Sequence, residues 1–111
     1  MHINYETAAT TIVDAAGAAG GIDEVRRLAD RGWPANRPLS PAAGCRVEAG
    51  EGEDYDTGTV DVVYEDGTAD ISWDSCISTR DSLARMSLTE ESDRRLRAAI
   101  QARAVAVVAE G

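Results

Sequence analysis

Two alternating runs joined by a turn sequence restrict the fold of this chain more than any other feature. Residues 60–64 and 69–74 have the period of two that is typical of half-buried strands. Residues 65–68 between them read Glu-Asp-Gly-Thr, and Asp-Gly is the strongest short-range signal of a hairpin. We therefore expect an antiparallel pair whose apolar positions are Val60, Val62 and Tyr64 on one strand and Ala69, Ile71 and Trp73 on the other.

Helical periodicity precedes this β region. Asn4 is the expected N-cap of a helix whose apolar residues recur up to Ala16. Glycines at positions 17, 20 and 21 are expected to break it, and a second helix follows over residues 22–31. Gly32 is the expected stop, because the Trp-Pro pair after it prevents continuation. Residues 1–33 are therefore predicted to form a helical hairpin.

Residues 34–43 contain three prolines and are predicted to form an extended connector. The β module is expected over residues 44–86, with shorter strands at 44–47 and 76–80 on either side of the hairpin. The chain is expected to pack as one α+β unit, since each helix has only a narrow apolar stripe.

Residues 87–109 are predicted to form a C-terminal amphipathic helix. The sequence opens with Ser87-Leu88-Thr89-Glu90, which has the Ser-x-x-Glu form of a capping box. The apolar residues that follow at roughly helical intervals include Leu96, Ile100 and Ala104.

The negative charge of the chain belongs to the β module. The protein has a net charge of −9, but residues 48–81 contain eleven acids and one arginine, a net charge of −10. The remaining residues contain nine acids and ten arginines, a net of +1. Such a segment repels nucleic acid and anionic membranes. It is either a solvated surface that protects the strands from aggregation or a surface that attracts a basic protein.

Four short motifs in the β module occur in a recognisable order. They are Gly44-x-Arg46-Val47, Gly58-Thr59-Val60, Asp66-Gly67 and Ile71-x-Trp73-Asp74. Together they resemble small five-stranded barrels of the Src-homology-3-like or Tudor-like type, most of all small bacterial and phage domains with the same order of motifs. The resemblance implies a small antiparallel β-barrel, covers about a third of the chain and implies little about function. Domains of this kind often have a glycine soon after the Trp-Asp pair, where this chain has Ser75-Cys76.

Some Tudor-like barrels bind methylated cations in an aromatic cage, for which the candidates here are Tyr55, Tyr64 and Trp73. Tyr64 and Trp73 are also expected core residues, so only Tyr55 is expected to be exposed.

An enzyme is not expected. The only histidine is His2, near the terminus, which argues against Ser-His and Cys-His pairs and against most zinc sites. Cys45 and Cys76 are expected to be buried, reduced thiols, with a disulfide or a reactive thiol as alternatives. No cofactor or metal site is expected, no signal peptide or membrane span is visible, and a cytoplasmic protein is predicted.

The predicted function is non-catalytic binding of a basic protein surface. The candidate residues are Glu51, Glu53, Asp54, Tyr55, Asp56, Asp61, Asp70 and Asp74. One alternative is a phage or mobile-element inhibitor, an anti-CRISPR protein for example, whose carboxylates mimic DNA and block a nucleic-acid-binding protein such as a CRISPR effector. Another is an oligomerising phage structural component. A homodimer, in which the arginines of the last helix meet the acidic module of a second copy, is a further alternative.

Overall fold

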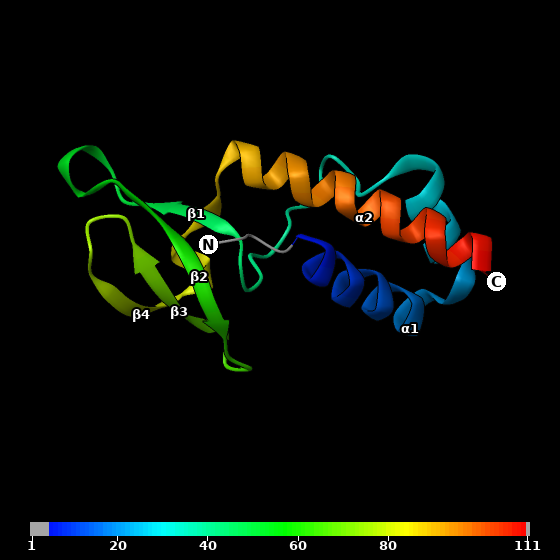
Figure 1. Cartoon of the computed structure of the whole chain (residues 1–111), viewed down its shortest axis with the longest axis horizontal. Coiled ribbons are helices and arrows are strands. Elements are labelled where there is room, and N and C mark those ends of the chain that lie inside the picture. Colours follow the sequence, from blue (N-terminus) through cyan, green and yellow to red (C-terminus); the bar gives the residue numbers. More distant parts are fainter. Residues whose placement is uncertain (1–4, 111) are drawn as a thin grey trace. The chain divides into compact units, whose positions relative to one another are not determined.

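The computed structural model describes residues 5–110, so the expected N-cap Asn4 and His2 lie outside the described part. The described chain divides into two compact units (Figure 1). The sheet unit comprises residues 39–93, and the helical unit comprises residues 5–38 with 94–110. The charge follows this division: the sheet unit has fourteen acids and three arginines, whereas the helical unit has six acids and eight arginines.

The sheet unit contains a five-stranded antiparallel sheet with the order β4-β3-β2-β1-β5. Its strands are β1 (Arg46–Ala49), β2 (Asp56–Val63), β3 (Thr68–Trp73), β4 (Ser78–Ser82) and β5 (Ser87–Leu88). Short 3₁₀ helices, η1 (Gly52–Asp54) and η2 (Leu83–Arg85), precede β2 and β5. Within the described residues no pairing joins β4 to β5, so the sheet is open. The α+β class is confirmed, and the closure expected of a barrel is not observed.

The predicted hairpin between β2 and β3 is confirmed. Gly67 has φ 86°, and its N–H donates to the carbonyl of Tyr64 at 3.2 Å. The Tyr64 N–H in turn donates to the carbonyl of Thr68 at 2.8 Å. A three-residue loop that ends in a left-handed glycine is a common hairpin connection. Asp66 accepts the Thr68 N–H at 3.0 Å, which further fixes the turn.

A bulge in β2 changes which side chains are buried. Val60 pairs with Ile71, but Val62 pairs with Asp70, so Asp61 is an extra residue on β2. An extra residue reverses the alternation beyond it. Val60 is therefore only 1% exposed, whereas Val62 is 45% exposed. The prediction that Val60, Val62 and Tyr64 share one face is wrong for this reason.

The core of the sheet unit is built from aliphatic residues, since the chain has no phenylalanine. Its buried members are Val47, Val60, Ala69, Ile71 and Met86, with Trp73 and Leu83 packed against them.

The packing of β3 on β2 explains why the motif Gly58-Thr59-Val60 begins with a glycine. It pairs with Trp73 across β2 and β3, and it is buried. A Cβ at Gly58 would lie 2.9 Å from Ile71 Cγ2, from the carbonyl oxygen of Ser72 and from Trp73 Cε3. Glycine is required because Trp73 packs directly on the backbone of β2.

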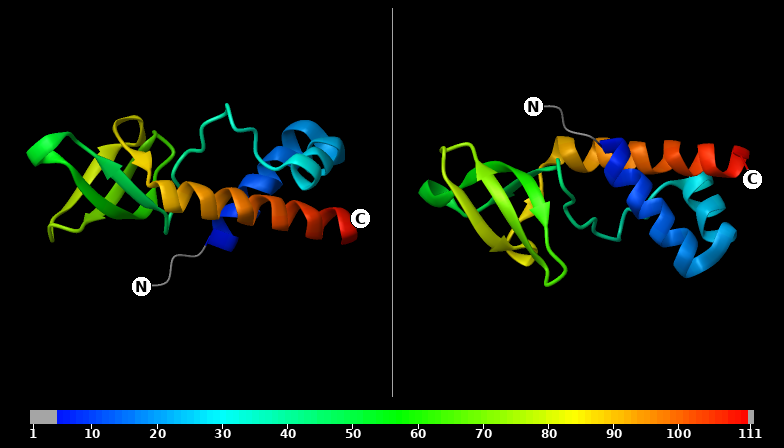
Figure 2. Two further views of the ribbon diagram at one scale, coloured as in Figure 1. Left: turned by 90° about the horizontal axis from the view of Figure 1, so that it is seen from above. Right: turned by 60° about the horizontal axis from the view of Figure 1, so that its bottom comes forward.

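In the helical unit, α1 (Tyr5–Arg31) consists of two segments on either side of Gly21, which has φ 71° and ψ −168°. The change of direction is visible in Figure 2. The predicted break is thus confined to Gly21, while Gly17 and Gly20 remain helical. A Cβ at Gly17 would come within 3.3 Å of Val25 Cγ2, which shows that the two segments pack closely there. Gly32 ends the helix as predicted, with φ 73° and a 2.8 Å bond to the carbonyl of Leu28.

The last helix, α2 (Glu90–Glu110), begins later than predicted. Ser87 belongs to β5, where it cannot act as the N-cap. Thr89 caps the helix instead, because its Oγ1 accepts the N–H of Ser92 at 3.3 Å. The predicted capping box is therefore wrong. The buried positions Leu96, Ile100 and Ala104 are confirmed.

We predict that Gly58→Ala lowers the free energy of unfolding by about 1 to 3 kcal/mol, because the new methyl group overpacks the contact with Trp73. Urea unfolding measures the change. Ser78→Ala, at an exposed position of β4, is the control and is expected to leave the midpoint unchanged. An unchanged midpoint for Gly58→Ala would contradict the close approach of Trp73.

Candidate partner-binding site

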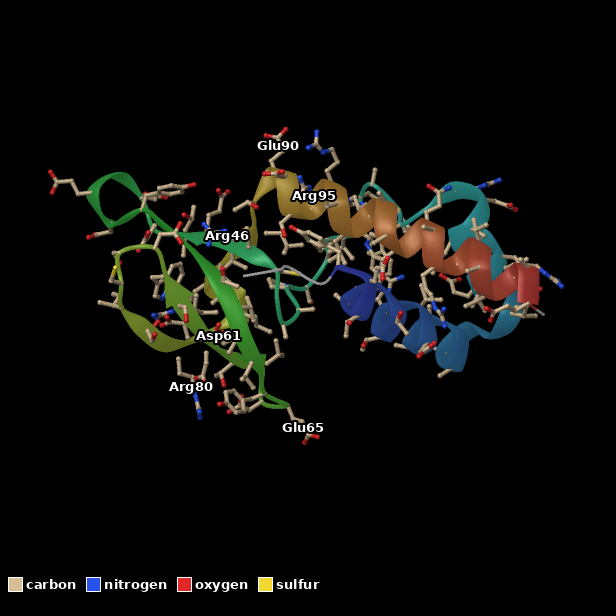
Figure 3. The ribbon with its side chains drawn as sticks, viewed as in Figure 1. Arg46, Asp61, Glu65, Arg80, Glu90 and Arg95 are labelled. Carbon is tan, nitrogen blue, oxygen red and sulfur yellow. The ribbon has the colours of Figure 1, made fainter. Side chains whose placement is uncertain are left out.

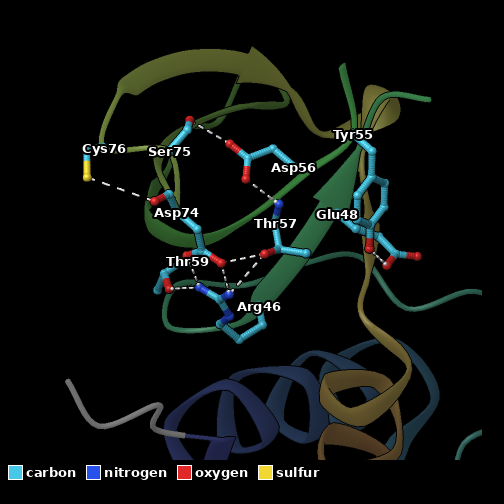
Figure 4. Close-up of polar contacts among 9 residues, drawn as sticks. All are labelled: Arg46, Glu48, Tyr55, Asp56, Thr57, Thr59, Asp74, Ser75 and Cys76. Carbon is cyan, nitrogen blue, oxygen red and sulfur yellow. Dashed lines mark hydrogen bonds and ion pairs between the residues drawn. The ribbon is translucent and has the colours of Figure 1, made fainter. Parts of the chain in front are cut away.

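An ion pair joins the first residue of β1 to the residue that follows β3 (Figure 4). Arg46 donates through Nη1 to Asp74 Oδ1 at 2.9 Å and through Nη2 to Asp74 Oδ2 at 2.5 Å. The same guanidinium donates to Thr59 Oγ1 at 3.0 Å and to Thr57 Oγ1 at 3.2 Å, and both threonines lie on β2. The hydroxyl of Thr57 also donates to Asp74. Two parallel bonds to one carboxylate hold Asp74 in a fixed position.

These contacts keep Asp74 ionised. Hydrogen bonds from Arg46, and then from Thr57, lower the pKa of Asp74 from its ordinary value of 3.8 to about 2. The Asp74 N–H donates to the carbonyl of Thr57 at 2.8 Å, which ties the backbone as well. Asp74 was predicted to bind a partner, but within this chain its charge is already balanced by Arg46.

Asp70 is paired in a similar way. It accepts the hydroxyl of Tyr64 at 2.6 Å and the Nε–H of Arg80 at 3.0 Å, and these bonds lower its pKa. The Arg80 guanidinium stacks on the ring of Tyr64, 3.9 Å from its centroid. Figure 3 labels Arg80 beside the sheet. The face of Tyr64 is thus occupied by a cation of the same chain.

Three more of the predicted residues make hydrogen bonds. Asp61 accepts the hydroxyl of Ser72. Asp56 accepts the Thr57 N–H and the hydroxyl of Ser75, at 2.8 Å and 2.7 Å. The hydroxyl of Tyr55 donates to Glu48 at 2.8 Å, which raises the pKa of that phenol. None of these four hydrogen bonds neutralises a charge, because each donor is uncharged.

The other predicted residues are Glu51, Glu53 and Asp54, all in the loop between β1 and β2. All three are exposed, and within residues 5–110 none of their side-chain carboxylates has a hydrogen bond or an ion pair. Gly50 makes this loop possible: its φ is 86°, and a Cβ there would lie 2.2 Å from the carbonyl oxygen of Asp54. Of the five predicted carboxylates without an ion pair in the described residues, three therefore lie in one short loop, and Asp56 and Asp61 lie on β2.

Two grooves border this loop, and Tyr55, which is 51% exposed, lines both of them. The Trp73 groove has a volume of about 390 Å³ and is lined by Tyr55, Trp73 and Ile77 together with the acids Glu53, Asp54 and Asp56. The Arg85 groove has a volume of about 420 Å³, and its charged lining residues are Glu48, Glu51 and Arg85. Tyr55, Ala49 and Gly50 line both grooves.

The turn after β3 supplies one wall of the Trp73 groove. Cys76 has φ 73°, the only positive φ at a described residue other than glycine. Its N–H donates to the carbonyl of Trp73 at 3.0 Å, while the Trp73 N–H donates to the carbonyl of Ile77 at 2.8 Å. Cys76 therefore stands at a position that favours glycine.

The two cysteines differ in environment, and both are free thiols. Cys45 is buried as expected, and burial raises its pKa. Cys76 is exposed, so the expectation that it is buried is wrong. The turn geometry places its side chain at the surface.

Sequence patterns did not indicate that several residues belong to this site. Arg46 appeared only as part of a motif, because its partner Asp74 is distant along the chain. Arg85 and Ile77 were not singled out, since neither belongs to a pattern. The aromatic cage does not form as proposed: Tyr55 and Trp73 line the same groove, but Tyr64 does not.

No family model, curated protein or solved structure matches this chain. What it does must therefore be inferred from its own residues. Within residues 5–110, no group of three or more His, Cys, Asp or Glu side chains is arranged to hold a metal ion. In the same part of the chain, no helix is both long enough and apolar enough to cross a membrane.

We predict that Asp74→Asn lowers stability at neutral pH and that this difference disappears in acid. The folded-state pKa of Asp74 is lowered to about 2, so its stabilising contribution is present above its ordinary pKa of 3.8. That contribution is lost as the pH falls from about 4 through about 2. Urea midpoints of wild type and variant should therefore differ at pH 7 and converge toward pH 2.

Asp54→Asn is the control for this series, because the Asp54 carboxylate has no partner within the described residues. Its urea midpoint should follow that of wild type at each pH. A gap between wild type and Asp74→Asn that is independent of pH would show that the ion pair with Arg46 is not its cause.

We predict that Cys76→Gly raises the free energy of unfolding by roughly 1 kcal/mol, because it removes the strain of a left-handed residue with a Cβ. Cys76→Ala keeps the Cβ and should leave stability unchanged. Urea unfolding under reducing conditions measures both. Equal stabilisation by the two variants would assign the effect to the thiol and not to the backbone.

Proposed function

We propose that this protein is a non-catalytic binding module that recognises a basic surface of another protein through the loop between β1 and β2. The observation that carries this proposal is the exposed, unpaired set of carboxylates at Glu51, Glu53 and Asp54, beside the exposed ring of Tyr55. Unpaired charges accelerate the encounter with an oppositely charged partner, and an exposed tyrosine supplies contact area at low entropic cost.

The position of these residues supports the proposal further. Trp73 packs on Gly58, and the ion pair with Arg46 holds Asp74, the residue after Trp73. The side of the Trp73 groove that β3 provides is therefore held in place. A binding surface supported in this way loses less conformational entropy when a partner docks.

Mimicry of DNA is the second candidate function. It requires an extended array of free carboxylates in place of phosphates. Here the charges of Asp70 and Asp74 are balanced by Arg80 and Arg46. Because the remaining free carboxylates of the predicted site lie mainly in one loop, we favour a localised contact with a basic protein.

We also propose that the sheet belongs to the Src-homology-3-like class. Its order β4-β3-β2-β1-β5, with a 3₁₀ helix between β4 and the short strand β5, supports this assignment.

The proposed function is tested with the variant Glu51→Gln/Glu53→Gln/Asp54→Asn. Immobilised wild type and variant are compared for the proteins that they retain from a cell lysate at low salt. We expect wild type to retain one or more basic proteins, in a salt-dependent manner, and the variant to lose them.

The matched control is Asp14→Asn/Glu65→Gln/Glu110→Gln, which removes the same number of charges at exposed positions elsewhere. Glu65, for example, lies at the tip of the β2–β3 turn (Figure 3). The control should retain the same proteins as wild type. Equal retention by the loop variant, or equal loss by both variants, would contradict recognition through this loop. If a retained protein binds DNA and wild type displaces that DNA, mimicry becomes the better assignment.

A further inference from the structure

The two grooves beside Tyr55 differ in charge although they share a wall. The Trp73 groove has three acids and no base among its lining residues. The Arg85 groove has two acids and one base, and one of those acids, Glu48, accepts the Tyr55 hydroxyl. The two grooves therefore offer a cation different environments.

The Trp73 groove has the lining that an arginine side chain requires. The rings of Tyr55 and Trp73 and the side chain of Ile77 are suited to its apolar stem and to the face of its guanidinium. The carboxylates of Glu53 and Asp54, unpaired within the described residues, are available for its charge. The volume of about 390 Å³ suits one long side chain, since it lies at the small end of ligand pockets.

Arg85 has the opposite effect on its own groove. Of the three arginines in the sheet unit, Arg46 and Arg80 are each paired with an aspartate. Arg85 is exposed and has no partner within residues 5–110. Its full charge therefore repels a basic side chain that enters the Arg85 groove.

Resting on the proposed function, we propose that the Trp73 groove takes one arginine side chain of the partner and that Arg85 excludes a second basic residue from the neighbouring groove. Tyr55 lines both subsites. The site consequently gives a protein segment with a run of basic residues no advantage over one with an isolated arginine. Arg85 is thus a specificity-determining residue that acts by repulsion.

The test uses short, blocked peptides of glycine and serine with one arginine, or with two arginines at increasing separation. Binding to the full chain is followed by two-dimensional amide NMR, which resolves the indole signals of Trp33 and Trp73. We expect the one-arginine peptide to shift the Trp73 signal and not that of Trp33. We expect two-arginine peptides to bind wild type within about twofold of the one-arginine peptide, which is the statistical gain from a second copy of the ligand group.

The decisive variant is Arg85→Gln. It should raise the affinity of at least one two-arginine peptide by about fivefold or more and leave that of the one-arginine peptide within about twofold. Arg94→Gln removes the same charge at an exposed position of the helical unit and should change neither. Tyr55→Leu should weaken the one-arginine peptide by about fivefold, because the cation loses one aromatic face.

Several outcomes would overturn the inference. One is absence of binding by the one-arginine peptide at millimolar concentration, or binding that shifts other signals but not that of Trp73. Another is wild type that already prefers two-arginine peptides by about fivefold. Equal gains in Arg85→Gln and Arg94→Gln would assign the effect to net charge. If the loop variant still loses its retained proteins in any of these cases, the proposed function stands and only the arginine subsite fails.

Discussion

The ion pair between Arg46 and Asp74 connects the strands of the sheet unit that carry the candidate site. Arg46 begins β1, and Asp74 follows β3. In the sheet, β2 lies between β1 and β3. The guanidinium reaches Asp74 across Thr57 and Thr59 of β2, which fixes three strands on one face. Gly58, between the two threonines, points to the opposite face and accommodates Trp73. Residues 57–59 thus contact the Arg46–Asp74 pair on one face of the sheet and Trp73 on the other. A register slip of one residue would disrupt both the polar contacts of Arg46 and the core.

The contacts of Asp74 show that the acidic residues of the β module do not all have the same role. Residues 48–81 have a net charge of −10, but the carboxylates in that segment have different roles. Asp74 and Asp70 form ion pairs with arginines, and Asp66 fixes the hairpin turn through Thr68. The acids of the loop before β2 have no such role within the described residues. Structural carboxylates are therefore distinguished from candidate binding carboxylates by their partners, which a count of charges cannot supply.

The features that the sequence predicted are those determined by neighbouring residues. The Asp-Gly turn, the stop at Gly32 and the buried series from Leu96 depend on local conformation or on a regular period. The features that it missed depend on the sheet. The bulge at Asp61 reverses the faces of β2, and β5 takes Ser87 away from the helix that it was expected to cap. In the site, the loop acids were predicted, but the pairing of Arg46 with Asp74 and the place of Arg85 required the strand order.

The arginines of the helical unit do not form a simple basic surface. Arg97 donates to the backbone carbonyls of Trp33 at 3.3 Å and of Pro34 at 3.1 Å, just after the end of α1. Arg37 stacks on the ring of Trp33, 4.7 Å from its centroid, and Arg27 pairs with Glu24. These guanidiniums stabilise the end of α1 and its following turn, as cations do near the C-terminus of a helix. A homodimer that used Arg97, from the last helix, would have to give up its contacts with Trp33 and Pro34, whereas binding of an external basic protein would not, and this difference favours a different molecule as the partner of the acidic loop.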